Sequence, residues 1–198
     1  MPSPIGHALA GLTAAWIADL VPGDRDWRTA PASGSWYRRS GNGLTLACAV
    51  LGASPDLDLL FVTHRTVTHS VGAVAFVAIF AAASAALADR PIPRVAAMCA
   101  AAYATHLFLD WLGVDEFPPR GIQGLWPLSH KWFISDADFF RQTARREIFT
   151  APSMIKNLEA IVQEIAILGP VVVAVWLVRV KALSGLSSEV TRRDHAAQ

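Results

Sequence analysis

Seven histidine and aspartate residues occur in four short groups along the chain, and these residue types are suited to holding a divalent metal ion. The groups are His7, Asp56 with Asp58, His64 with His69, and His106 with Asp110. His106 and Asp110 are four residues apart, so on a helix they project from the same face and can reach one ion together. Imidazole and carboxylate ligands without thiolate suit Zn²⁺, Mn²⁺ or Fe²⁺. The chemistry that such a site would support is hydrolysis by a metal-activated water.

The candidate ligands are six of these residues, and the polar residues beside them are assigned supporting roles. We expect one or two ions, zinc first with manganese or iron as alternatives, held by His7, Asp56, His64, His69, His106 and Asp110. Asp58 would act as a general base or complete the shell of a second ion, and Arg65 would neutralise a phosphate or a developing oxyanion. Thr68 or Ser70 would orient a ligand through a hydrogen bond.

Three of the groups also have purely structural interpretations. The residues around Asp56, a serine and a proline followed by the acid, are typical of the start of a helix. A single histidine on an apolar helix, such as His7, is often a hydrogen-bonded core residue. His106 and Asp110 could hydrogen-bond to each other without a metal, although burying them near the end of an apolar helix is costly unless they are paired.

The remaining spacings and polar residues carry weaker signals. The spacing of five between His64 and His69 is not helical, so it predicts His64 in a turn and His69 in the first turn of the following helix. His130 is expected in a loop and Glu164 in the first turns of the last apolar segment. His195 is expected in a polar tail.

The composition favours a membrane protein. Hydrophobic residues make up 53% of the 198 residues and charged residues 17%, whereas soluble domains average about 25% charged residues. These values exclude a disordered chain and disfavour an ordinary soluble enzyme. The formal net charge of +1 provides no basic field, so nucleic acid is not expected as a partner. Cys48 and Cys99 are too few for a disulfide framework or a thiolate zinc site, and their apolar surroundings suit buried thiols.

Five apolar segments predict an all-α, multi-helix membrane bundle with four or five apolar helices. The segments are 5–21, 44–53, 71–88, 95–112 and about 158–180. The uncharged run 71–88 has 18 residues and is just long enough to span a bilayer, whereas 44–53 is too short to cross one alone. We expect one domain over residues 1–183 and a polar tail over 184–198. The first residues lack a basic region, so a cleaved signal peptide is not expected.

Two polar connections separate the predicted helices. Residues 22–43 have the composition of a solvated loop, whereas 113–157 favour a long cap at the membrane interface because they are rich in aromatic residues. These include Trp126, Trp132, Phe133, Phe139, Phe140 and Phe149. If the helices alternate in direction, the four His/Asp groups fall at one end of the bundle. Ten of the seventeen Lys and Arg residues then lie at the other end, which the positive-inside rule places in the cytoplasm.

Five motifs carry a resemblance to a known family. In chain order they are Pro4-Ile5-Gly6-His7-Ala8-Leu9-Ala10-Gly11, Pro55-Asp56-Leu57-Asp58, His64-Arg65-Thr66-Val67-Thr68-His69-Ser70, Thr105-His106-Leu107-Phe108-Leu109-Asp110 and Leu125-Trp126-Pro127. Together they resemble the membrane-bound, metal-dependent hydrolases, a family that includes a LexA-regulated bacterial inner-membrane protein. The resemblance covers roughly residues 4–130, and its most specific part is 64–70, where Thr66 stands in place of a glycine frequent in the family.

The resemblance implies a multi-pass protein of the bacterial inner membrane that holds zinc or another divalent ion. A fainter similarity of His106 and Asp110 to zinc-dependent phospholipase C and the related single-strand nucleases favours phosphoester chemistry by analogy. We therefore expect a metal-dependent hydrolase whose partners are membrane lipids and a small-molecule or lipid-linked substrate. The alternatives are a membrane protein that binds metal without catalysis or moves ions or protons, and a soluble helical hydrolase.

Overall fold

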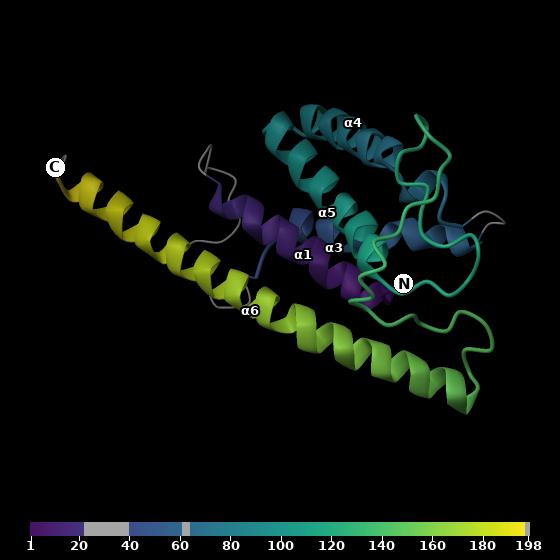
Figure 1. Ribbon diagram of the computed structural model, residues 1–198. Helices are drawn as coiled ribbons and strands as arrows, with labels where there is room; N and C mark the ends of the chain where they lie inside the picture. The colour runs from purple at the N-terminus through teal and green to yellow at the C-terminus, as the bar shows by residue number, and fades with distance from the viewer. Residues whose placement is uncertain (22–39, 61–63, 197–198) are drawn as a thin grey trace.

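The structure is a computed structural model that describes residues 1–21, 40–60 and 64–196 (Figure 1), with side chains up to residue 182 except that of residue 19. Within these ranges the chain forms five α-helices and no β-strand, so the predicted all-α class is confirmed. The elements are α1 (Pro4–Leu20), α3 (Gly43–Ala53), α4 (Val71–Leu87), α5 (Ile92–Leu112), α6 (Ala151–Ala196) and the short 3₁₀ helices η1 (Ser54–Leu60) and η2 (Val67–His69). Most of the predicted solvated loop, 22–39, lies outside the described residues.

Polar side chains fix where the apolar helices begin. The hydroxyl groups of Ser3 and Ser70 each accept a hydrogen bond from a backbone amide in the first turn of α1 and α4, respectively. Asn42 and Thr45 form a reciprocal capping box at the start of α3. Each cap satisfies an amide that the helix itself leaves without an acceptor, so helix starts near the predicted positions follow from local sequence.

Three of the described helical segments are long and apolar enough to cross a membrane, namely Gly43–Leu60, Ile92–Leu112 and Ala151–Ala182. The first corrects a prediction, because η1 continues α3 and the combined segment has 18 residues. Asp56 therefore does not begin an α-helix. The last apolar segment is also longer than predicted, since the backbone of α6 stays helical through the polar tail as far as Ala196.

The centre of the bundle is built from small residues that let the helices approach closely. α1 contacts α3, α5 and α6 (Figure 1). It meets α3 at Gly11 and Gly52, where a Cβ on Gly52 would lie 2.5 Å from the carbonyl oxygen of His7 and 3.0 Å from Cα of Gly11. Both cysteines are buried, as predicted. The main core cluster consists of Ala15, Cys48, Ala81, Ala85, Val95, Met98, Cys99 and Ala102.

Residues 113–150 connect α5 to α6 without a helix and lie over the end of the bundle that carries the N-terminus (Figure 1). Isolated bridges pair Gly113 with Phe140 and Ile122 with Phe133. Phe140 is buried, whereas Phe149 is exposed. The segment covers one end of the bundle, and its predicted location at the membrane interface stays a prediction.

α6 is the helix with the most exposed apolar surface. Within Ala151–Ala182 only Ala160, Glu164 and Arg179 are buried within the protein. It packs along α1 and extends past it (Figure 1). The hydrocarbon of a bilayer is the solvent that suits this surface, in agreement with a membrane protein.

Replacing Gly52 with alanine should destabilise the bundle, because the new Cβ would meet the carbonyl oxygen of His7 at 2.5 Å. Overpacking of this kind costs about 1–3 kcal/mol. Gly43→Ala is the matched control, since a Cβ at Gly43 meets nothing within 4 Å. Thermal unfolding of the detergent-purified proteins should show a lower Tm for Gly52→Ala and no decrease for the control. Equal Tm values would contradict the close contact between α1 and α3.

Candidate metal centre

Five of the predicted ligands meet at the end of the bundle that carries the N-terminus. His7 lies in the first turn of α1, and Asp56 lies in η1. His69 ends η2, immediately before the cap of α4, and so does not lie in the first turn of that helix as predicted. His106 and Asp110 face inward from the last turns of α5. The side chains of all but Asp56 are fully buried.

Four donor atoms, contributed by His69, His106, Asp110 and Asp56, face one another across short distances. The Nε2 atoms of His69 and His106 are 3.0 Å apart, and each lies 3.3 Å from Oδ2 of Asp110. Oδ1 of Asp56 is 3.6 Å from Nε2 of His69 and 3.7 Å from Nε2 of His106. Metal–ligand bonds of about 2.0–2.1 Å would separate donors by about 3.4 Å in a tetrahedron and about 3.0 Å in an octahedron. The four atoms therefore fit the first coordination shell of a single ion.

Hydrogen bonds at the Nδ1 atoms of His106 and His69 direct the Nε2 atoms of both rings at this cluster. Nδ1 of His106 lies 2.8 Å from the carbonyl oxygen of Gly52, which can only accept, so Nδ1 carries the hydrogen and Nε2 presents its lone pair. Thr68 donates its hydroxyl hydrogen to Asp58 at 2.6 Å, and its oxygen accepts from Nδ1 of His69 at 3.0 Å. Such contacts fix the tautomer of metal-ligating histidines. The bond between Thr68 and His69 is the contact that the predicted supporting role of Thr68 requires.

The carboxylates of the cluster are short of hydrogen-bond partners. Both oxygens of Asp110 and Oδ1 of Asp56 are buried with no donor in the described part of the chain. Buried carboxylates of this kind are costly unless a cation compensates them. Burial opposes protonation of His69, but its contacts with Asp110, Asp56 and Asp58 outweigh burial and raise the pKa of His69 well above its ordinary value. A proton on His69 thus compensates the carboxylates in the metal-free protein, and a divalent ion can replace it.

His7 joins the cluster from α1. Its ring stacks on that of His106 with centroids 3.7 Å apart, and its Nε2 lies 3.4 Å from Oδ1 of Asp110. Neither nitrogen of His7 has a hydrogen-bond partner among the residues that the structure describes. The geometry disfavours a hydrogen-bonded core histidine and places His7 where it can serve as a further ligand.

A family match now identifies the kind of membrane protein. The family model of the YdjM inner membrane protein matches residues 1–184, which include every candidate ligand. The chain belongs to the YdjM inner membrane protein family. It is thus an inner membrane protein, as predicted, and its three long apolar segments are candidates for crossing that membrane. No curated protein and no solved structure matches the chain.

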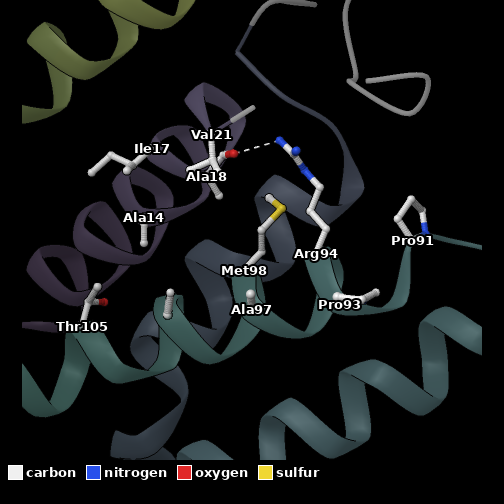
Figure 2. A pocket seen from close by; sticks show the side chains of 11 residues that line it. Ala14, Ile17, Ala18, Val21, Pro91, Pro93, Arg94, Ala97, Met98 and Thr105 are labelled. Carbon is white, nitrogen blue, oxygen red and sulfur yellow. Dashed lines mark hydrogen bonds between the residues drawn. The ribbon is translucent and has the colours of Figure 1, made fainter. Parts of the chain in front are cut away.

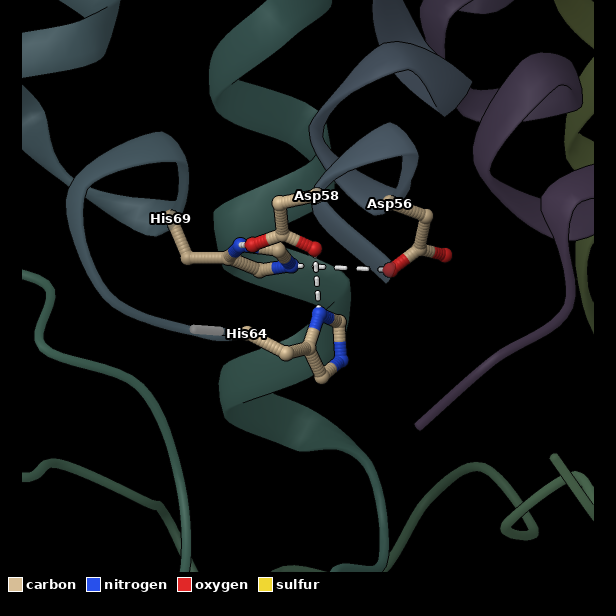
Figure 3. Close-up of side chains that lie close together, drawn as sticks. All are labelled: Asp56, Asp58, His64 and His69. Carbon is tan, nitrogen blue, oxygen red and sulfur yellow. Dashed lines mark hydrogen bonds and ion pairs between the residues drawn. The ribbon is translucent and has the colours of Figure 1, made fainter. Parts of the chain in front are cut away.

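Asp58 and His64 form a second group beside the first (Figure 3). Nδ1 of His64 hydrogen-bonds to one oxygen of Asp58, and the other oxygen accepts from Thr68 and from the amide of Arg65 at 3.1 Å. In Figure 3 the imidazoles of His64 and His69 approach Asp58 from two directions. These contacts favour a role for Asp58 in positioning two imidazoles, in place of its predicted role as a general base.

Arg65 holds the turn between the two histidines of the 64–70 motif. Its guanidinium forms a buried ion pair with Asp115, donates to the carbonyl oxygen of Phe117 at 3.3 Å and lies over the ring of Trp132. Its φ of 66° is in the left-handed region, which is unusual for a residue other than glycine. Because the guanidinium is engaged by a protein carboxylate, the structure disfavours the predicted role of Arg65 in holding the charge of a substrate.

Three other polar residues have positions that differ from the expected ones or add nothing to the cluster. Ser70 donates to the carbonyl oxygen of Val67 at 2.6 Å and caps α4, so its hydroxyl does not orient a ligand. Glu164 lies well inside α6 and not in its first turns, and its carboxylate accepts from the hydroxyl of Ser3 and, at 2.6 Å, from its amide. His130 is exposed in the segment 113–150.

Sequence reasoning missed two residues that support the cluster. Gly52 supplies the carbonyl that orients His106, and Asp115 is the buried partner of Arg65. Neither residue type is distinctive by itself, and both contacts join residues about fifty positions apart, so no local pattern could reveal them. The side chain of His195 lies outside the described residues.

An apolar groove of about 710 Å³ lies between α1 and α5, beyond the cluster (Figure 2). Its lining residues fall within 14–21 and 91–105, and Arg94 donates to the carbonyl oxygen of Ala18 at 2.8 Å. Since α5 is long and apolar enough to cross the membrane, lipid acyl chains can fill this groove. We assign no chemistry to it.

Removing a ligand of the cluster should abolish metal binding. Wild-type protein purified in detergent without chelators should carry roughly one or two divalent ions per chain by elemental analysis. His69→Ala and Asp110→Ala should retain little metal, because each variant removes one of two cluster atoms, Nε2 of His69 and Oδ2 of Asp110, that lie 3.3 Å apart. His130→Ala, which alters an exposed histidine, is the matched control and should bind metal like the wild type. Wild-type protein without stoichiometric metal would contradict the assignment.

Metal uptake should release protons and should strengthen as the pH rises. The raised pKa of His69 favours the protonated ring in the metal-free protein, and an ion must displace this proton. Protonation stabilises the metal-free fold below the ordinary histidine pKa, and that contribution is lost as the pH rises through the raised folded-state pKa. Titrating zinc into metal-free protein with a pH indicator should release roughly one proton per ion at pH 7. Absence of proton release would show that His69 is already neutral.

Proposed function

We propose that the chain is a metal-dependent hydrolase of the inner membrane. The observation that carries this proposal is the set of four facing ligand atoms in the cluster, in which Oδ1 of Asp56 and both oxygens of Asp110 find no hydrogen-bond donor among the described residues. Two imidazoles and two carboxylates suit zinc first, with manganese or iron as alternatives. Five- or six-coordination leaves room for water and substrate beside four protein ligands. A divalent ion bound here would lower the pKa of a coordinated water toward about 7 and polarise the bond under attack.

The cluster opens on the side of Asp56 and His64. Their side chains are 12% and 14% exposed, whereas those of His69, His106 and Asp110 are fully buried. His64 lies before η2, and the other four residues lie at or near the ends of their helices, so a substrate reaches them at the end of the bundle and not through its core. This placement supports a phosphoester substrate that is itself found at the membrane surface, with a lipid-linked one favoured.

We assign the role of general base to His64 in place of the predicted role as a ligand. Asp58 accepts from Nδ1, which leaves the lone pair on Nε2, and this atom has no hydrogen-bond partner among the described residues. Burial lowers the pKa of His64 although Asp58 opposes the change, so the ring is neutral at pH 7 and can take a proton at Nε2. Asp58 would keep the tautomer and stabilise the protonated ring.

The second candidate is a membrane protein that binds metal without catalysis or moves protons. A protonated His69 among buried carboxylates supports this alternative. Ion and proton pathways, however, place their polar residues near the middle of the bilayer. Here the cluster lies at the ends of α1, η1, η2 and α5, which supports an interfacial active site instead.

Hydrolysis assays on detergent-purified protein test the proposal. Zinc- or manganese-loaded wild type should hydrolyse p-nitrophenyl phosphate, bis(p-nitrophenyl) phosphate or phosphatidic acid, and a chelator should abolish the activity. His64→Gln should retain the metal and lower kcat by about 100-fold, the usual contribution of a general base. The exposed-site variant His130→Gln is the control and should be fully active. A metal-loaded wild type that hydrolyses none of these esters would favour the non-catalytic alternative.

A further inference from the structure

Arg145 is held beside the cluster by the segment that covers the end of the bundle. Its guanidinium contacts Sδ of Met1 at 2.7 Å. Thr143 donates to the carbonyl oxygen of Met1 through its amide and its hydroxyl, each at 3.3 Å, and the amine of Met1 donates to the carbonyl oxygen of Val114 at 2.6 Å. These contacts fix Arg145 against the residues that precede α1.

Arg145 lies near the open side of the cluster, because its partner Met1 bonds to Val114, next to the Asp115 that holds Arg65 beside His64. Burial lowers the pKa of the Met1 amine to about 6, and Arg145 acts in the same direction while Asp110 and Asp56 oppose it. Burial also lowers the pKa of His64, and Arg145 adds to that change. The influence of Arg145 on the Met1 amine and on His64 agrees with this position.

Arg145 is half-buried and has no carboxylate partner in the part of the chain that the structure describes. By contrast, Arg65 pairs with Asp115 and Arg141 pairs with Glu159. The thioether of Met1 is only a weak acceptor. The contacts within the described chain thus leave the guanidinium of Arg145 without a counter-anion, which a phosphate can supply.

We propose that Arg145 binds the anionic phosphate group of the substrate. The inference rests on the proposed hydrolase function and narrows its substrate to phosphate esters. A guanidinium presents parallel N–H groups that match two phosphate oxygens, and this geometry distinguishes arginine from lysine. Arg145 thus takes the charge-binding role that the sequence assigns to Arg65, whose guanidinium is engaged by Asp115. A lipid headgroup and a soluble phosphate ester present the same phosphate group to Arg145.

Titration calorimetry with inorganic phosphate tests the inference on the zinc-loaded, detergent-purified protein. Arg145→Gln should weaken phosphate binding by about tenfold or more, and Arg145→Lys should recover part of it because the charge remains. Arg146→Gln, at the exposed neighbouring position, is the matched control and should bind phosphate like the wild type. All variants should keep the zinc content and the Tm of the wild type, since none removes a proposed ligand.

The outcomes separate this inference from the hydrolase proposal. Unchanged phosphate affinity in Arg145→Gln and Arg145→Lys, with full zinc content, overturns the role of Arg145 and leaves the hydrolase proposal standing. Failure of the wild type to bind zinc overturns both.

Kinetics on two substrates then identify the source of the phosphate. Phosphatidic acid in phosphatidylcholine vesicles represents the lipid source, and p-nitrophenyl phosphate represents the soluble source. On the substrate that the enzyme uses, Arg145→Gln should raise KM more than it lowers kcat, because the contact is already made in the bound ground state. A loss confined to kcat would contradict a role in substrate binding.

Discussion

Two carboxylates and three imidazoles share one desolvated cluster at the end of a membrane bundle, and their need for a cation governs the surrounding structure. The candidate ligand atoms lie only 3.0–3.7 Å apart. They cannot all form hydrogen bonds with one another, because carboxylate oxygens and neutral Nε2 atoms are all hydrogen-bond acceptors. A proton or a divalent ion meets that need. The contacts of Gly52, Thr68 and Asp58 behind the rings make sense on this basis, since each directs a lone pair toward the same place.

The packing of the helices and the geometry of the cluster depend on the same residues. Gly52 has no side chain, which lets the backbone of His7 approach α3, and its carbonyl group orients His106. A larger residue at this position would therefore disturb α1 and move two rings that are stacked on each other. In membrane bundles small residues are usually discussed as packing devices, but here one of them also determines where ligand atoms lie.

The parts of the structure that depend on local sequence were predictable, and those that depend on distant partners were not. Apolar runs and side-chain caps predict the helices, and the residue types predict the composition of the cluster. The extension of α3 by η1 was missed because Asp56 and Asp58 interrupt the apolar pattern, and their burial depends on other elements. The engagement of Arg65 by Asp115 is likewise a contact over 50 residues that composition cannot reveal.

The bond between Ser3 and Glu164 sets an order of events during biosynthesis. Glu164 accepts from the backbone amide of Ser3 across 161 residues of sequence. The ribosome makes α1 long before it makes α6, so this amide must first be satisfied by water or lipid headgroups. The amide of His7 donates to the carbonyl oxygen of the same Ser3 at 3.1 Å, so His7 and Glu164 are linked through one residue. The start of α1, which carries His7, therefore gains its bond to α6 only when translation is nearly finished, after the other four candidate ligands have been made.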